Sequence, residues 1–181
     1  MSHSLVIRRG RIFDPSQKID VVGDILILNG KIQAVGRITL PPGPTITELD
    51  AKGWLVTPGW IDIHTHLREP GQTHKETIRT GTEAAAAGGF TSIACMANTT
   101  PVNDSSFITS YINQKVASEG LINVYPVGAI TKGLEGQELA EIGSMWEAGI
   151  VAISDDGKLI YSLHNMTELL HGMQQLIFGK R

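Results

Sequence analysis

The sequence contains very little cysteine. This and other features that are rare in it exclude several classes of protein. The 181 residues include a single cysteine, Cys95, which excludes an internal disulfide framework and fits a reducing compartment. Fifteen basic residues stand against eighteen acidic ones, and no basic cluster forms a stripe along the chain. This balance argues against nucleic acid as the main partner.

Long hydrophobic runs are also missing. No stretch approaches the roughly 18 apolar residues that a membrane helix needs. Residues 1–4 are not followed by the basic and apolar regions of a secretory signal. We therefore expect a cytoplasmic protein without a membrane partner. The composition, 41% hydrophobic and 18% charged, allows a packed core and argues against disorder.

Short alternating apolar runs fill residues 1–56, which we predict to form a small β-sandwich domain. The pair Asn29-Gly30 stands between two such runs and is a strong hairpin signal, because a type I′ turn needs positive φ at both central residues. Arg9-Gly10 also separates two apolar runs and predicts a second hairpin.

From residue 57 strands and helices alternate. The expected strands lie at 60–64, 90–96, 121–127 and 150–154, and the expected helices at 75–87, 104–118, 136–148 and 163–178. Four strand–helix units are typical of a parallel α/β sheet or a (β/α) barrel, which periodicity alone does not separate. A full (β/α)8 barrel needs about 250 residues. We therefore expect residues 57–181 to form a partial barrel, its N-terminal half, with two unpaired sheet edges, and interpret the chain as a fragment, a truncated product or half of an assembly.

A metal site is predicted at His64-Thr65-His66, where the first of these strands ends. Side chains two apart in a strand share a face, so both imidazoles can hold one ion at the barrel end where active sites form. The alternative is two ordinary polar residues at a strand end. Asp155-Asp156-Gly157 ends the fourth strand on the same rim, as a metal-bridging carboxylate or as a plain Asp-Gly turn with one carboxylate capping the next segment. The histidine pair favours the metal site.

Two more polar residues follow the same strands. Arg68 lies just past the histidine pair, and Asn98 follows the second strand. A guanidinium can clamp a substrate carboxylate and an amide can orient it, although an exposed loop arginine usually has no specific role. His164 and His171 share a helical face and are expected to be surface residues. Cys95, on an apolar strand, is expected to be a buried hydrophobe and not a nucleophile.

The segment 57–71, TPGWIDIHTHLREPG, resembles the dihydroorotases, within the cyclic amidohydrolases. The resemblance continues through KET at 75–77, AGGFT at 87–91, MANT at 96–99 and SDDG at 154–157. It implies a metal-dependent (β/α)8 barrel attached to a small β-sandwich domain, and a hydrolase that interconverts dihydroorotate and N-carbamoyl-L-aspartate in pyrimidine biosynthesis.

The resemblance also implies roles for single residues. His64 and His66 are similar to the first metal ligands, and Asp156 to the carboxylate that approaches both metals. Arg68 and Asn98 match residues that hold the substrate carboxylate, and His66 borders the same pocket. One or two Zn²⁺ ions are implied, with Co²⁺ or Mn²⁺ as alternatives. The family's catalytic aspartate lies on a later strand, so no catalytic acid or base is assigned here.

Alternatives remain at this stage. One is a catalytically dead homologue that serves as a scaffold for aspartate transcarbamoylase. Another is a hydantoinase-like or allantoinase-like hydrolase, although the carbamylated lysine that those relatives place on the fourth strand has no counterpart in residues 150–154. A homo-oligomer is also open. Without a general acid, we expect the 181-residue chain alone to be weakly active or inactive.

Overall fold

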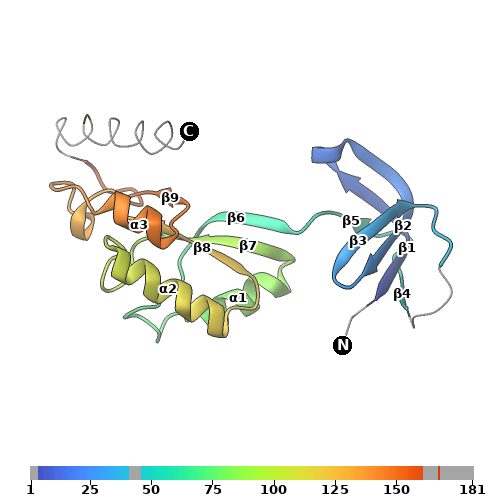
Figure 1. Cartoon of the computed structure of the whole chain (residues 1–181), viewed down its shortest axis with the longest axis horizontal. Helices are drawn as coiled ribbons and strands as arrows, with labels where there is room; N and C mark the ends of the chain where they lie inside the picture. Colours follow the sequence, from blue (N-terminus) through green and yellow to red (C-terminus); the bar gives the residue numbers. More distant parts are fainter. Residues whose placement is uncertain (1–3, 41–45, 161–166, 168–181) are drawn as a thin grey trace. The chain divides into compact units, whose positions relative to one another are not determined.

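The computed structural model describes residues 4–40, 46–160 and 167 (Figure 1). The chain divides into two compact units, Met1–Pro58 and Gly59–Arg181. In these described ranges no helix is both long and apolar enough to cross a membrane. The helix predicted at 163–178 lies outside the described residues apart from residue 167, as do His164 and His171.

The first unit is built on one five-stranded sheet. Its strands are β1 (Leu5–Asp14), β2 (Ile19–Leu28), β3 (Lys31–Gly36), β4 (Thr47–Asp50) and β5 (Leu55–Val56). The strand order is β3-β2-β1-β4, and β5 also pairs with β1. The β2–β3 hairpin confirms the Asn29-Gly30 prediction, because these residues have φ values of 51° and 74° at its turn.

The hairpin predicted at Arg9-Gly10 is wrong. β1 continues through both apolar runs as a single strand, and its register against β2 shifts between Ile7 and Gly10. Arg9 has a φ of 62°, and its backbone N–H donates to the Asp24 carboxylate. A β-bulge therefore absorbs the irregular residue without reversing the chain. The reversal comes later, at the short 3-10 helix η1 (Pro15–Gln17), which the side chain of Asp14 caps.

The second unit is a curled parallel sheet with helices along one face (Figure 1). Its strands run in the order β6-β7-β8-β9, with β6 and β9 at the two edges of the described sheet. The strands are β6 (Trp60–Thr65), β7 (Phe90–Cys95), β8 (Asn123–Gly128) and β9 (Ala152–Ile153), and the helices are α1 (Ile78–Ala87), α2 (Ser106–Glu119) and α3 (Ile142–Ala148). This arrangement confirms the predicted α/β fold, a partial barrel that follows a small β unit.

Helix α3 begins six residues later than the predicted 136. Thr131 and Leu139 form an isolated antiparallel bridge, and the Lys132 N–H donates to the Glu138 carbonyl at 2.8 Å. A short 3-10 turn, η2 (Lys132–Leu134), lies inside this loop. Gly136 has a φ of 73°, which helical backbone excludes, so the loop extends to residue 141.

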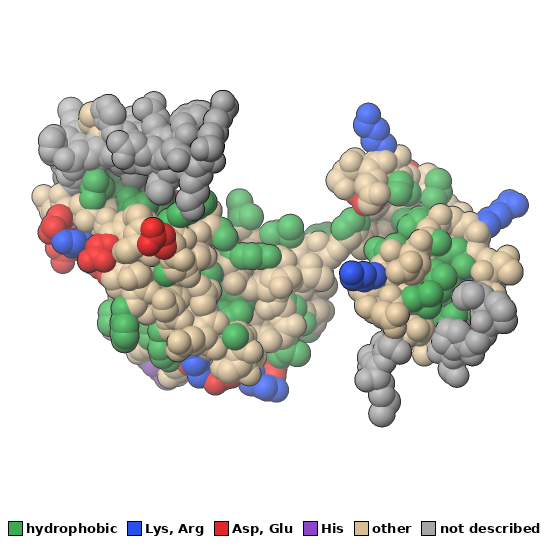
Figure 2. Space-filling model, viewed as in Figure 1, with side chains coloured by type: hydrophobic (Ala, Val, Ile, Leu, Met, Phe, Trp, Pro, Cys, Tyr) green, Lys and Arg blue, Asp and Glu red, His purple; other side chains and the backbone are tan. Residues whose placement is uncertain are grey.

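The core of the second unit lies between the sheet and the helices. It buries apolar side chains from both layers: Leu67, Ile78, Ile93, Cys95, Ile108, Ile112 and Val124. Apolar side chains also remain on the surface, and Figure 2 shows them along the edge where β6 runs. On this strand Ile61 is 66% exposed and Ile63 79% exposed.

Candidate metal centre

The predicted histidine pair lies at the carboxyl end of β6. Thr65 is the last residue of the strand, so His66 lies just beyond it. Asp62 pairs with Ile93 and Thr65 with Cys95, so three steps along β6 match two along β7, which is a bulge. The centroids of the His64 and His66 rings lie 5.2 Å apart.

Asp156 faces this pair from the turn that follows β9. Its Oδ1 lies 2.9 Å from Nε2 of His64, and its Oδ2 lies 3.8 Å from Nδ1 of His66. Asp156 has a φ of 48° and Gly157 one of 81°, so the predicted Asp-Gly turn is present as well. The turn and the contact of Asp156 with the histidines therefore occur together in the structure.

The donor set fits a divalent cation. One ligand atom from each of His64, His66 and Asp156 can be chosen so that all three lie within 4.8 Å of one another. Two imidazoles and a carboxylate are a usual set for zinc, with ligand distances of about 2.0–2.2 Å. Two ligands of one ion can thus be up to about 4.4 Å apart, close to the separation found here. In the part of the chain that the structure describes, this is the one group of its kind.

Asn98 and Arg68 lie beside the cluster. Asn98 follows β7, its Oδ1 is 2.9 Å from Nδ1 of His66, and its Nδ2 donates to Oδ2 of Asp156 at 2.7 Å. Nη1 of Arg68 lies 3.5 Å from the backbone carbonyl oxygen of Asn98. The structure therefore brings all five predicted site residues together at the carboxyl ends of three strands. Their roles toward metal and substrate stay predictions.

Two buried carboxylates near the site have structural partners that sequence reasoning missed. Asp155, 4% exposed, accepts hydrogen bonds from the N–H groups of Ile130 and Thr131 and from the Thr131 hydroxyl. Glu69, 5% exposed, accepts from the N–H of Ile78 at the start of α1. The only sequence signal for either was an acidic residue next to a predicted site residue. Both carboxylates anchor site loops to neighbouring elements.

Charge and burial set the ionisation of two groups near the site. Hydrogen bonding to Glu119, and then to Glu69, raises the pKa of the Lys115 ammonium, whose Nζ lies 3.3 Å from Oε1 of Glu69. Burial raises the pKa of the Cys95 thiol to about 11. The thiol is therefore neutral at physiological pH, in agreement with the expectation that it is not a nucleophile.

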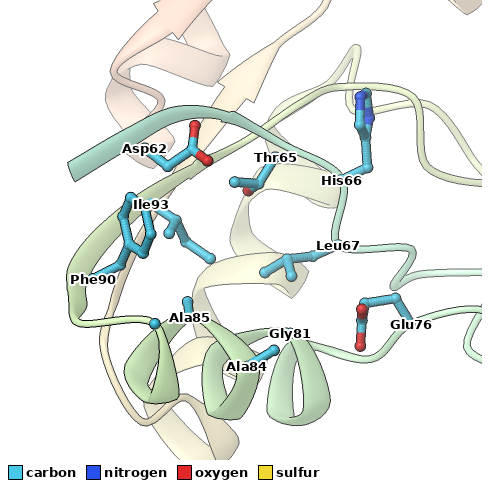
Figure 3. A pocket seen from close by; sticks show the side chains of 11 residues that line it. Asp62, Thr65, His66, Leu67, Glu76, Gly81, Ala84, Ala85, Phe90 and Ile93 are labelled. Atoms are coloured by element: carbon cyan, nitrogen blue, oxygen red, sulfur yellow. The ribbon is translucent and has the colours of Figure 1, made fainter. Parts of the chain in front are cut away.

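A cavity of about 250 Å³ lies between β6 and α1 (Figure 3). Small residues of α1, Gly81, Ala84 and Ala85, form part of its wall, and Asp62 and Glu76 supply carboxylates. Figure 3 shows the His66 imidazole pointing away from α1. The cavity is therefore on the helix side of the strand, whereas the His66 ring belongs to the cluster on the other side.

Comparison with known proteins gives the sequence relatives. A dihydro-orotase-like family model matches residues 53–176. A dihydroorotase of Geobacter sulfurreducens is 55% identical over 168 residues, and one of Geotalea daltonii is 52% identical over 167. Each alignment covers 92% of this chain but 39% of the relative, so the chain spans about two fifths of the length of these curated relatives.

Two solved structures with the same fold carry another name, hydantoinase. An L-hydantoinase from Arthrobacter aurescens superposes with a TM-score of 0.77 at 22% identity, over 95% of this chain and 38% of that one. A D-hydantoinase gives 0.73 at 25% identity, over 97% and 38%. The first likeness supports the fold alone, whereas the sequence match extends through the segments that hold the cluster. On the family match and the identity to the two relatives, this chain belongs to the dihydro-orotase-like family.

Proposed function

We propose that this chain supplies the first metal-binding half-site of a hydrolase that interconverts dihydroorotate and N-carbamoyl-L-aspartate. The single observation that carries the proposal is the meeting of His64, His66 and Asp156 within ligand distance of one another. These residues come from opposite edges of the described sheet, in a chain whose relatives are named dihydroorotases. Zn²⁺ is the proposed ion, because two imidazoles and a carboxylate are a usual zinc-binding set. The cytoplasm is the proposed location, because a single cysteine fits a reducing compartment.

The chemistry needs an electrophilic carbonyl and a nucleophile at neutral pH. A divalent cation, when bound, polarises a carbonyl oxygen and lowers the pKa of water from about 15.7 towards about 7. His64, His66 and Asp156 would hold that cation. The Asp156 side chain is only 16% exposed, which strengthens its electrostatic interactions relative to those of a fully solvated carboxylate.

Substrate placement falls to the neighbouring polar side chains in this proposal. The Arg68 guanidinium is half-buried beside Asn98, at the same rim as the cluster. It can form two parallel hydrogen bonds with the carboxylate that dihydroorotate and carbamoyl aspartate share. This clamp would present the ring amide to the cluster, because fixing one end of a small rigid ring also fixes the other.

A protonated group must also reach the leaving nitrogen. No described residue beside the cluster has been assigned that role. We therefore expect the 181-residue chain to bind metal but to hydrolyse the substrate slowly or not at all. Turnover comparable to that of a full-length relative, measured by carbamoyl aspartate formation, would contradict this expectation.

The test of the proposed site is zinc binding by the purified chain, measured by isothermal titration calorimetry after chelator treatment. We expect one ion to bind, and His64→Ala to weaken the affinity by more than about 100-fold because one of three ligands is lost. His74→Ala is the matched control, since this exposed histidine lies outside the cluster. Absence of binding, or equal affinity of the His64→Ala variant, would refute the proposal.

A further inference from the structure

We propose that Asn98 is a positioning residue that sets the tautomer of His66 and the orientation of Asp156 for metal binding. The inference rests on the proposed function, since it concerns how the same cluster is prepared for its ion. Its basis is the side-chain amide, which contacts both ligands at once. The two contacts measure 2.9 Å to Nδ1 of His66 and 2.7 Å to Oδ2 of Asp156.

The chemistry of the carboxylate determines which way the amide faces. An ionised carboxylate only accepts hydrogen bonds, so the amide group 2.7 Å from Asp156 must be the NH₂. The amide oxygen of Asn98 therefore faces His66. An amide oxygen also only accepts, so Nδ1 of His66 must carry a hydrogen. The neutral imidazole then has its lone pair on Nε2, the other nitrogen, which becomes the atom available to a cation.

The same amide orients the second ligand. Its NH₂ holds Oδ2 of Asp156, while Oδ1 of that carboxylate faces Nε2 of His64 at 2.9 Å. One carboxylate oxygen is thus held by the amide, and the other lies within hydrogen-bond distance of Nε2 of His64. Partners of this kind fix ligand geometry and commonly change metal affinity by about 10–100-fold when removed.

The backbone next to Asn98 is held in place by burial and by hydrogen bonds. It follows the buried residues Met96 and Ala97, and two neighbouring N–H groups, those of Thr99 and Asn103, donate to the Ala97 carbonyl. A side-chain amide has two N–H groups and an oxygen with two lone pairs. The contacts to His66 and Asp156 use one N–H and one lone pair, so positioning is compatible with the predicted contact to a substrate carboxylate.

Two variants separate the two halves of the contact. Asn98→Ala removes both partners, whereas Asn98→Asp keeps an acceptor for His66 and loses the donor to Asp156. Asn123→Ala is the control, since Asn123 begins β8 at the opposite, amino end of the sheet and its amide contacts Thr91 and Ser92 instead. The readouts are zinc affinity by calorimetry and the His66 tautomer, from long-range ¹H–¹⁵N spectra of the metal-free chain at alkaline pH.

We expect wild type, Asn98→Asp and Asn123→Ala to show His66 protonated at Nδ1, and Asn98→Ala to lose this preference. Zinc affinity should fall by about 10–100-fold in Asn98→Ala and stay unchanged in Asn123→Ala. If wild type binds zinc but the tautomer and affinity of Asn98→Ala equal those of wild type, the positioning role is refuted while the metal site stands. If Asn98→Ala does not fold, an Nε2-protonated His66 in wild type would refute it equally.

Discussion

Asp155 and Asp156 are adjacent in the chain, yet their carboxylates have separate partners. Asp155 is buried and accepts hydrogen bonds from the backbone N–H groups of residues 130 and 131 and from the Thr131 hydroxyl. These residues lie just past the end of β8. Asp156 faces His64 across the cluster. The backbone is left-handed at Asp156, where the directions of the two side chains diverge. One carboxylate therefore fixes the turn, and the other is presented by it.

Replacing Asp155 should destabilise the second unit. Asp155→Ala leaves two N–H groups and a hydroxyl without their acceptor, and we expect the free energy of unfolding to fall by about 3 kcal/mol. Asp155→Asn, which retains one acceptor oxygen, should lose less. Urea unfolding measures both values, and amide exchange at Thr131 localises the effect. A loss under about 1 kcal/mol in the alanine variant would show that the turn does not depend on this carboxylate.

Gly71 should tolerate no side chain. It has a φ of 88°, and a Cβ there would lie 1.8 Å from the carbonyl oxygen of Thr100, so the loop after Arg68 would have to move. We expect Gly71→Ala to cost about 3 kcal/mol or more, from strained backbone and overlap together. Gly89→Ala is the control, because Gly89 has a φ of 83° and open space around it.

The control should cost about 1 kcal/mol, from the backbone alone. Thermal or urea unfolding of the two variants gives the comparison. Equal losses would mean that the loop yields to the added methyl group, and the proposed placement of Arg68 would then not depend on close packing against residue 100.

Ionisation of Cys95 should lower the free energy of unfolding at alkaline pH. Burial raises the pKa of the thiol from 9.0 to about 11, so the folded state keeps its proton where the unfolded state loses it. This contribution is present in full below pH 9 and is lost as the pH rises towards 11. The slope is about 1.4 kcal/mol for each pH unit in that window.

Cys95→Ala should remove this slope while leaving the other alkaline titrations in place. Urea unfolding between pH 8 and 11 of wild type and variant isolates the difference. Parallel profiles for the two proteins would show that the thiol ionises equally in both states. The neutral, buried thiol should also resist thiol reagents in the folded chain at pH 8.

The alternation of apolar residues and turns was sufficient to predict most of the fold. Asn29-Gly30 carries its own backbone preference, so that hairpin was readable from two residues. The strand–helix order of the second unit was equally readable, because each amphipathic segment must bury one face. Arg9-Gly10 failed because its positive φ serves a bulge held by Asp24, a partner 15 residues away that local sequence does not reveal.

The sequence predicted that these polar residues lie close together, but it did not predict the geometry of their contacts. His64 ends a predicted strand, the other four residues follow predicted strands, and the carboxyl ends of parallel strands meet at one rim. The four are His66, Arg68, Asn98 and Asp156. The bulge at His64, the amide contact between Asn98 and its two neighbours, and the anchoring by Asp155 depend on side-chain packing between elements. Contacts of this kind leave no pattern in the local sequence, so they become visible only in the folded structure.

The contact between His64 and Asp156 also depends on the curvature of the sheet. β6 and β9 are three strand spacings apart, which in a flat sheet is about 14 Å. Their side chains nevertheless approach to 2.9 Å. Flattening the sheet would therefore separate the two ligands. An ion bound by residues from both edges would hold the sheet in its curved form, and its affinity would fall as the sheet flattened.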